Sequence, residues 1–272
     1  MNEIAIMAAT AVEAGHAILE IYGTGFEVEE KSDHSPITTA DRKAHDIITA
    51  RLEPAGLPIL SEEGRHLPYD TRKGWARFFL VDPLDGTREF IKRNGEFTVN
   101  IAVIENHRPV AGVIYVPVRD VLYLAARGSG AFRIENASSH FEGNTDPDIQ
   151  ALSAAGVPLP LRGPTDRPYT VIGSRSHSTP ELEAFVHEKE REHGRIDFIS
   201  AGSSLKFCRV AEGSADIYPR TGPTCEWDTA AGQAIAEQAG ATVKEFHTGK
   251  PLRYNKEDLL NPWFVVERRV IG

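Results

Sequence analysis

The stretch Phe78–Phe90, FFLVDPLDGTREF, decides how the rest of the chain is interpreted. Its apolar start predicts a short buried strand that ends at Asp82, where Pro83 fixes the backbone as it leaves the sheet. The turn that follows can bring Asp85 back toward Asp82. Gly86 then permits a close approach between the backbone and a ligand. The stretch therefore predicts an acidic, ligand-accessible site at the end of a strand.

Acidic side chains recur at two other predicted element ends. Glu62 and Glu63 follow an apolar segment in LPILSEEG, and Asp228 opens a helix in CEWDTAAG. Such chain ends gather at one edge of a sheet, and carboxylates together with the Leu84 carbonyl are the oxygen ligands that suit Mg²⁺ or Mn²⁺. Each motif alone is more often a solvated turn or a helix cap. Their combination on apolar elements favours a divalent-cation site.

The spacing of apolar residues predicts two kinds of architecture. Helices at 3–22 and 41–52 precede closely spaced strands, as in an α+β layer, and helices alternate with strands later in the chain, as in an α/β fold. The other predicted elements are strands at 78–81, 97–104, 110–118, 121–126, 169–173, 196–199, 215–218, 242–246 and 263–266, and helices at 180–193, 203–212 and 228–238. We expect an N-terminal domain at 1–135 with most of the metal ligands, an irregular connection at 136–168 and a C-terminal domain at 169–272 that carries Asp228.

Composition limits the class of protein. A chain of 272 residues with 41% hydrophobic residues is long enough for roughly two domains and is not disordered. Its net charge of −9 argues against non-specific binding of long nucleic acid. No window approaches the roughly 20 consecutive apolar residues of a membrane span, and the N-terminus lacks the basic start of an export signal. With only Cys208 and Cys225 there is no disulfide framework, so we expect a cytoplasmic protein, with loose attachment to the inner face of the membrane left open.

Cationic residues after residue 170 are candidates for binding a second phosphate. Lys206 in GSSLKFC, with the Ser203 hydroxyl near a helix start, and Arg220 in IYPR can provide the charge. His177 in GSRSHS can contact a nucleotide or its phosphate. A helical lysine usually lies on a solvated face, and His177 can equally be a plain loop residue. These residues alone do not favour a nucleotide over a sugar phosphate.

Four segments carry a resemblance to a known family: LSEE, LVDPLDGTREFIKRNGEFTVNIAVI, GSSLKFCRVAEGSADIYPR and WDTAAGQAIAEQAG. They resemble the inositol monophosphatase superfamily, and EFIKRNGEFTVNIA and GSSLKFC are most similar to its CysQ branch, the 3′(2′),5′-bisphosphate nucleotidases. The resemblance implies a layered α-β-α-β-α sandwich, as in inositol monophosphatase and fructose-1,6-bisphosphatase. Nothing is carried over to residues 136–168.

The resemblance also implies roles for individual residues. Thr87 is similar to the threonine that positions the nucleophilic water, and Asp41 to the acid that supports it. Glu63 would accept hydrogen bonds or polarise a further metal-bound water. The implied Mg²⁺ ligands are Glu62, Asp82, the Leu84 carbonyl, Asp85 and Asp228. The implied phosphate and nucleotide contacts are the Gly86 and Thr87 amides, His177, Ser203, Lys206 and Arg220.

The implied reaction is hydrolysis of the 3′-phosphate of adenosine 3′,5′-bisphosphate to AMP by a metal-activated water, without a covalent enzyme intermediate. The same pocket would accept 3′-phosphoadenylyl sulfate, which would link the enzyme to sulfur assimilation, and inhibition by Li⁺ is a family-level expectation. An inositol or fructose phosphatase is the alternative within the superfamily. A non-catalytic metal- or nucleotide-binding regulator is the alternative of another class, and the presence of Thr87 and Asp41 argues against it. The oligomeric state stays open.

Overall fold

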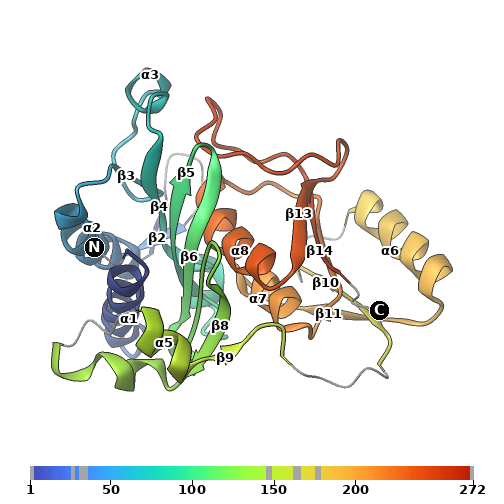
Figure 1. Ribbon diagram of the computed structural model, residues 1–272, viewed down its shortest axis with the longest axis horizontal. Coiled ribbons are helices and arrows are strands. Elements are labelled where there is room, and N and C mark those ends of the chain that lie inside the picture. The colour runs from blue at the N-terminus through green and yellow to red at the C-terminus, as the bar shows by residue number, and fades with distance from the viewer. Residues whose placement is uncertain are drawn as a thin grey trace.

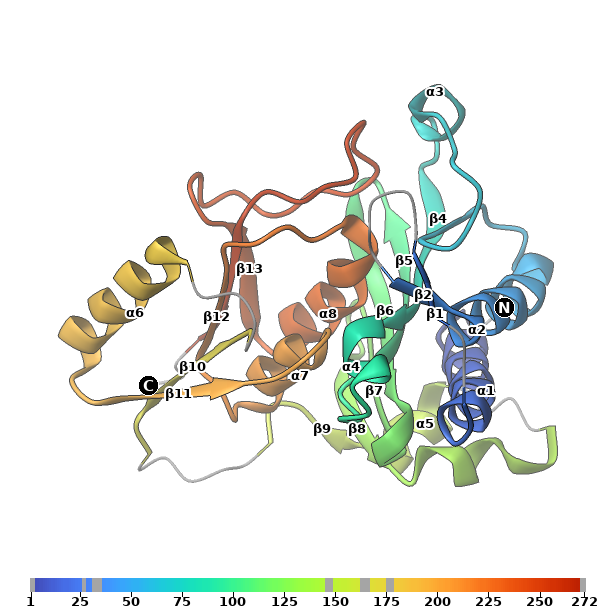
Figure 2. The ribbon, with the colours of Figure 1, turned by 180° about the vertical axis from the view of Figure 1, so that it is seen from behind.

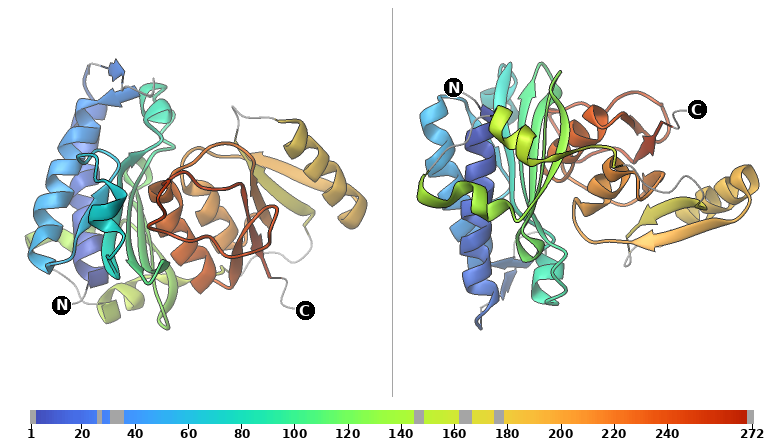
Figure 3. Two further views of the ribbon diagram at one scale, coloured as in Figure 1. Left: turned by 90° about the horizontal axis from the view of Figure 1, so that it is seen from above. Right: turned by 60° about the horizontal axis from the view of Figure 1, so that its bottom comes forward.

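The computed structural model describes residues 3–25, 28–30, 36–144, 149–161, 167–174 and 179–269. They form the predicted α-β-α-β-α layers, as Figure 1 shows. Helices α1 (Glu3–Tyr22) and α2 (Thr39–Leu52) cover one face of the larger sheet, while α7 (Leu205–Glu212) and α8 (Glu226–Gln238) lie between the two sheets (Figure 3). Helix α6 (Pro180–His193) lies outside the smaller sheet.

The larger sheet has seven strands in the order β3-β4-β5-β6-β7-β8-β9. Its strands are β3 (Ile59–Ser61), β4 (Arg77–Asp85), β5 (Thr98–Glu105), β6 (Arg108–Val116), β7 (Val121–Ala126), β8 (Gly130–Glu135) and β9 (Val157–Pro158). Strand β3 pairs with β4 in parallel, and each of the other pairs is antiparallel. The parallel pair matters for function because it brings two strand ends to the same edge of the sheet.

The smaller sheet has five strands in the order β11-β10-β12-β14-β13. Its strands are β10 (Tyr169–Gly173), β11 (Ile196–Ser200), β12 (Ile217–Arg220), β13 (Ala241–Glu245) and β14 (Phe264–Arg268). The first three strands of that order are parallel, and β14 is antiparallel to both of its neighbours. The short remaining elements are β1 (Val28–Glu30), β2 (Pro36–Thr38), α3 (Tyr69–Arg72), α4 (Thr87–Ile91), α5 (Ile149–Ala155) and the 3₁₀ turns Glu53–Ala55, Pro117–Arg119 and Ala137–Asn144.

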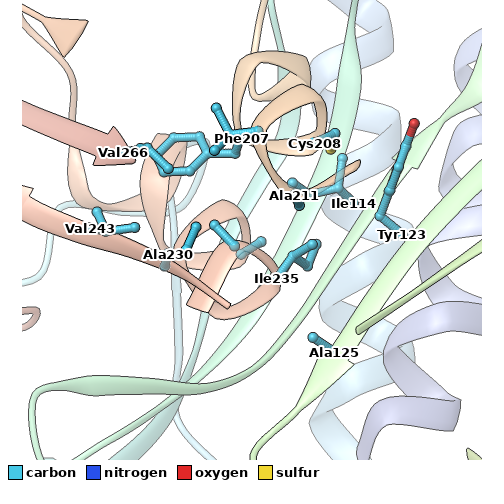
Figure 4. Packing of buried hydrophobic residues seen from close by; sticks show 14 of the residues in the cluster. Ile114, Tyr123, Ala125, Phe207, Cys208, Ala211, Ala230, Ile235, Val243 and Val266 are labelled. Carbon is cyan, nitrogen blue, oxygen red and sulfur yellow. The ribbon is translucent and has the colours of Figure 1, made fainter. Parts of the chain in front are cut away.

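Two hydrophobic cores lie on opposite faces of the larger sheet. Along β5, Val99 and Ile101 point toward α1 and α2, whereas Ala102 and Ile104 belong to the core beside α7 and α8. This is the period-two alternation of a strand that is buried on both faces. Figure 4 shows the second core, where β-strand residues such as Ile114 meet residues of both helices.

The second core draws side chains from both predicted domains, so the larger sheet and α8 are packed as one body. The division into domains at 1–135 and 169–272 stays a prediction. The intervening segment contains more regular structure than its composition suggests, namely a 3₁₀ turn, α5 and β9. Leu152 explains part of this difference, because α5 buries it completely in the core beside α1.

Helix α1 is long and apolar enough to cross a membrane, although polar residues interrupt its apolar stretch. It is the one helix of this kind in the described ranges. Most of its apolar stretch, 67%, is buried inside the protein. Ile4, Met7 and Ile18 are among the side chains that pack onto the larger sheet, so α1 is used here as a core helix.

Gly112 of β6 allows α8 to approach the sheet. A Cβ atom at this position would lie 2.6 Å from the Ala231 carbonyl oxygen and 2.9 Å from its Cα, and neither backbone atom can move without shifting the helix. We therefore expect Gly112→Ala to lower the free energy of unfolding by about 1–3 kcal/mol, as overpacked cores do. Urea denaturation measures this loss. Gly74→Ala, where a Cβ meets nothing within 4 Å, is the control, and equal stability of the two variants would contradict the prediction.

Candidate active site

An irregularity in β4 places two carboxyl groups on the same face of the sheet. Asp82 pairs with Asn100 and Asp85 with Thr98, so β4 uses one residue more than β5 between the two pairs. In a regular strand, residues three apart would face opposite sides, whereas this bulge turns both acids toward α8. The prediction that the strand ends at Asp82 is wrong: it continues to Asp85, and the bulge accommodates Pro83 within it.

Glu62 and Asp228 approach Asp82 from two other elements. Strand β3 ends at Ser61 and runs parallel to β4, and the Glu62 N–H donates to the Val81 carbonyl at 3.1 Å. Asp228 is the third residue of α8, where its Oδ2 accepts the Cys225 N–H at 2.8 Å and caps the helix. The sequence predicted that these acids converge at one sheet edge, and the structure brings them together there.

The electrostatics of the four acids reflect this crowding. Burial, followed by the nearby charges of Glu62 and Asp85, holds the pKa of Asp82 well above its usual range. Burial and the neighbouring Asp85 raise the pKa of Asp228 to about 8. Burial also raises the pKa of Asp85, although Lys206 opposes this. Other groups of the protein only partly compensate the negative charge of these carboxylates.

The donor atoms are oxygens, which suit a hard divalent cation, but they are not arranged around a single position. Among the described residues, no three His, Cys, Asp or Glu side chains form a ready-made metal site. The carboxylates bond to the protein instead: Asp82 Oδ1 accepts the Leu84 N–H at 3.1 Å, and Asp85 Oδ2 accepts the Ser204 N–H at 2.6 Å. An all-oxygen set with raised pKa values fits Mg²⁺ or Mn²⁺ chemically. The metal-ligand roles stay predictions.

Thr87 and Asp41 form a hydrogen-bonded pair beside these acids. The Thr87 hydroxyl donates to Asp41 Oδ1 at 3.1 Å and also approaches the Leu84 carbonyl at 3.4 Å. The other oxygen of Asp41 accepts the Thr38 N–H and hydroxyl, at 2.7 and 2.6 Å, in the capping box of α2. Asp41 is therefore held rigidly, and it in turn orients the Thr87 hydroxyl. Thr87 begins α4 after Gly86, whose φ of 94° favours glycine.

A cavity of about 240 Å³ joins two of the acids, Asp85 and Asp228, to the predicted substrate residues. Its lining includes the predicted residues Asp85, Gly86, Ser203, Lys206, Arg220 and Asp228. Ser203 has a positive φ of 45°, so the helix predicted from 203 begins at Leu205. The Ser203 hydroxyl and Arg220 Nε are buried and have no hydrogen-bond partner within the described part of the chain. Unpaired polar atoms in a cavity wall are available to a ligand.

Lys206 is not on a solvated helix face. It is buried, and its Nζ donates to the Ala201 and Ser203 carbonyls at 3.2 and 2.7 Å. Burial lowers its pKa to about 8, although nearby Asp85 favours the charged form. The ammonium group is thus held at the cavity wall close to an acid, where an incoming phosphate can share it.

Two predicted residues are placed neither in this cavity nor among the acids and the Thr87–Asp41 pair described above. Glu63 is half-buried and lies near Arg42, whose pKa it helps to raise after Glu29. His177 lies outside the described residues. The roles of both residues stay predictions.

Sequence reasoning missed three polar residues that hold Asp85. Asn100 Nδ2 donates to Asp85 Oδ2 at 3.2 Å, and the Ser204 hydroxyl donates to Asn100 Oδ1 at 2.8 Å. Thr98 shares a further bond of 2.8 Å with the Ser204 hydroxyl. Thr98 and Asn100 are polar positions within the otherwise apolar strand FTVNIAVI, and this was the signal that could have revealed them.

A model of the Inositol monophosphatase family matches residues 1–271. The chain belongs to the inositol monophosphatase family. This confirms the resemblance and the layered fold predicted from it.

Relatives within the family include nucleotidases. The 3′(2′),5′-bisphosphate nucleotidase CysQ of Escherichia coli strain K12 is 45% identical over 261 residues, which are 94% of this chain and 96% of that protein. The crystal structure of CysQ from Bacteroides thetaiotaomicron is 50% identical, with a TM-score of 0.87 and 97% of both chains covered. The suhB protein of Bartonella henselae is 25% identical, with a TM-score of 0.72 over 97% of this chain and 93% of that one.

Asn100 links the bulge of β4 to the start of α7. Replacing it by alanine removes one donor to Asp85 Oδ2 and leaves the Ser204 hydroxyl with one partner fewer in a buried position. We expect Asn100→Ala to lower the free energy of unfolding by about 1–3 kcal/mol, measured by urea denaturation at pH 7. The exposed Asn94, whose Oδ1 accepts the Glu96 N–H, provides the control variant Asn94→Ala. A smaller loss for Asn100→Ala than for the control would refute the prediction.

Proposed function

We propose that this protein is a Mg²⁺-dependent phosphatase that hydrolyses the 3′-phosphate of adenosine 3′,5′-bisphosphate to give AMP. The observation that supports it most directly is the cavity in which Asp85 and Asp228 share the wall with Ser203 and Arg220. One side offers carboxylates for a cation, and the other offers unpaired donors for an anion. The nucleotidase names of similar family members support the choice of substrate.

In this proposal Mg²⁺ is held by the carboxylates of Glu62, Asp82, Asp85 and Asp228 and by the Leu84 carbonyl. When bound, it would neutralise charge on the reacting phosphate. It would also lower the pKa of a water molecule, so that hydroxide is available near neutral pH. Burial and, after it, the neighbouring carboxylates raise the pKa values of Asp82 and Asp228, and a bound cation would offset both effects, which supports this assignment.

The chain's own contribution to the attack is to orient water. Because the Thr87 hydroxyl donates a hydrogen bond to Asp41, its oxygen can accept a hydrogen bond from a water molecule. That bond fixes the direction of the water's lone pairs toward the phosphate. Asp41, itself fixed by Thr38, prevents the hydroxyl from rotating. Because the water is oriented before it attacks, less entropy is lost on reaching the transition state than in the uncatalysed reaction.

The non-reacting phosphate is assigned to the opposite wall. Arg220 retains an unpaired Nε, the Ser203 hydroxyl is free within the described residues, and Lys206 adds a buried charge. The same wall would accept 3′-phosphoadenylyl sulfate. We further propose a cytoplasmic location and inhibition by Li⁺, both of which follow from the assignment to the nucleotidase branch.

A comparison of three phosphate esters tests the function. We expect kcat/KM for adenosine 3′,5′-bisphosphate to exceed the values for inositol 1-phosphate and fructose 1,6-bisphosphate by about a hundredfold or more, because the first competitor lacks a second phosphate and the other carries it on a sugar of different shape. Phosphate release should stop in EDTA and return with Mg²⁺. Preference for either sugar phosphate would assign the alternative function. No release from any ester with Mg²⁺ present would favour the non-catalytic regulator.

Thr87 allows a sharper test of the mechanism. Thr87→Val keeps the shape but removes the hydroxyl, so we expect kcat to fall by about a hundredfold or more, the range typical of a misplaced reactant. Thr87→Ser keeps the hydroxyl and should retain most of the activity. Steady-state kinetics with saturating Mg²⁺ measures both variants. Equal activity of the valine and serine variants would exclude the proposed role.

A further inference from the structure

Two cations at α4 line the active-site cavity from the side opposite α7. Arg88 lies in the helix and Lys92 directly follows its last residue, four positions after Arg88, and both side chains are exposed. Figure 2 shows α4 against the larger sheet, on the side that faces α7. Neither cationic side chain has a hydrogen bond or ion pair with any residue in the described ranges. Their charges are therefore uncommitted.

Helix α4 is too well anchored for these side chains to drift away from the cavity. Phe90 is fully buried and packs against Tyr22 and Phe97, with ring centroids 5.1 and 5.2 Å apart. At the end of the helix, the Arg93 guanidinium donates to the carbonyls of Tyr22 and Thr24, both at 2.5 Å. A pinned backbone with free cationic side chains is suited to recognising an anion.

The charges around the cavity favour a ligand with more than one anionic group. The acids of its lining are Asp85, Glu89 and Asp228, and the cations are Arg88, Lys92, Lys206 and Arg220. Asp85 and Asp228 are assigned to the metal under the proposed function. The remaining charges are four cations against Glu89 alone, an excess that a single phosphate would not balance.

We propose that Arg88 and Lys92 form an anion-binding rim that selects substrates with a second phosphate over those with one. This rests on the proposed function and adds to the wall formed by Ser203, Lys206 and Arg220. The rim acts on binding, because both side chains are exposed and, among the described residues, neither has a hydrogen bond or ion pair with Thr87 or Asp41. Its charge also attracts a polyanion before contact, which makes capture sensitive to salt.

The double variant R88A/K92A tests the rim with two substrates, adenosine 3′,5′-bisphosphate and adenosine 3′-monophosphate. We expect KM for the bisphosphate to rise by about tenfold, as for the loss of charge-assisted contacts, with kcat within about twofold of the wild type. The constants for the monophosphate should change by less than about twofold. The decrease of kcat/KM for the bisphosphate with rising salt should become shallower.

The variant K244A/K250A is the control, because it removes the same charge from two exposed lysines near β13, away from the cavity. Titration calorimetry of the two nucleotides gives the same selectivity as a ratio of Kd values. The ratio of Kd values tests the rim even if no turnover is detected. Turnover of the bisphosphate by the wild-type protein tests the proposed function separately. An equal loss with both nucleotides, or a change no larger than the control's, would overturn the proposal.

Discussion

The burial of several carboxyl groups beside one another is the constraint on which the rest of the site depends. Asp82 is buried, and its pKa is raised by burial and by Glu62 and Asp85. Such crowding is unfavourable for a folded protein unless protons, dipoles or cations compensate it. Here part of the compensation is built in, because Asp228 caps the start of α8 and Asp85 accepts the Ser204 N–H. The remaining charge is what makes the site suitable for a cation.

The two halves of the chain meet closely at this site. A Cβ at Gly202 would lie 2.6 Å from Glu89 Cγ and 2.9 Å from the Glu96 carbonyl oxygen, so the loop before α7 contacts α4 and the turn after it. Glu96 also accepts the Gly202 N–H at 2.9 Å. The left-handed Ser203 follows directly, and a strained backbone of this kind persists only where its surroundings hold it. The cavity wall formed by Ser203, Lys206 and Arg220 is therefore held in a fixed position relative to the acids.

Much of the fold and of the candidate site could be predicted from the sequence, because the patterns that indicate them lie within short segments of the chain. Asp82 and Asp85 stand in one short motif, and the apolar period of 3–22 marks a core helix. What could not be predicted depends on long-range pairing. Pro83 indicated the end of a strand, yet the pairing with β5 continues beyond it. Lys206 was predicted to bind substrate, but its burial could not be predicted, because nothing local shows that α7 is enclosed by two sheets.

The additional residue in β4 also restricts how this segment can change. The positions between Asp82 and Asp85 set which way each carboxyl points, because β4 advances three residues where β5 advances two. If the two strands advanced in step here, Asp85 would face α1, out of reach of Asn100, because it lies three residues after Asp82. The three-residue spacing of the two acids is therefore compatible with a shared face only because of the bulge.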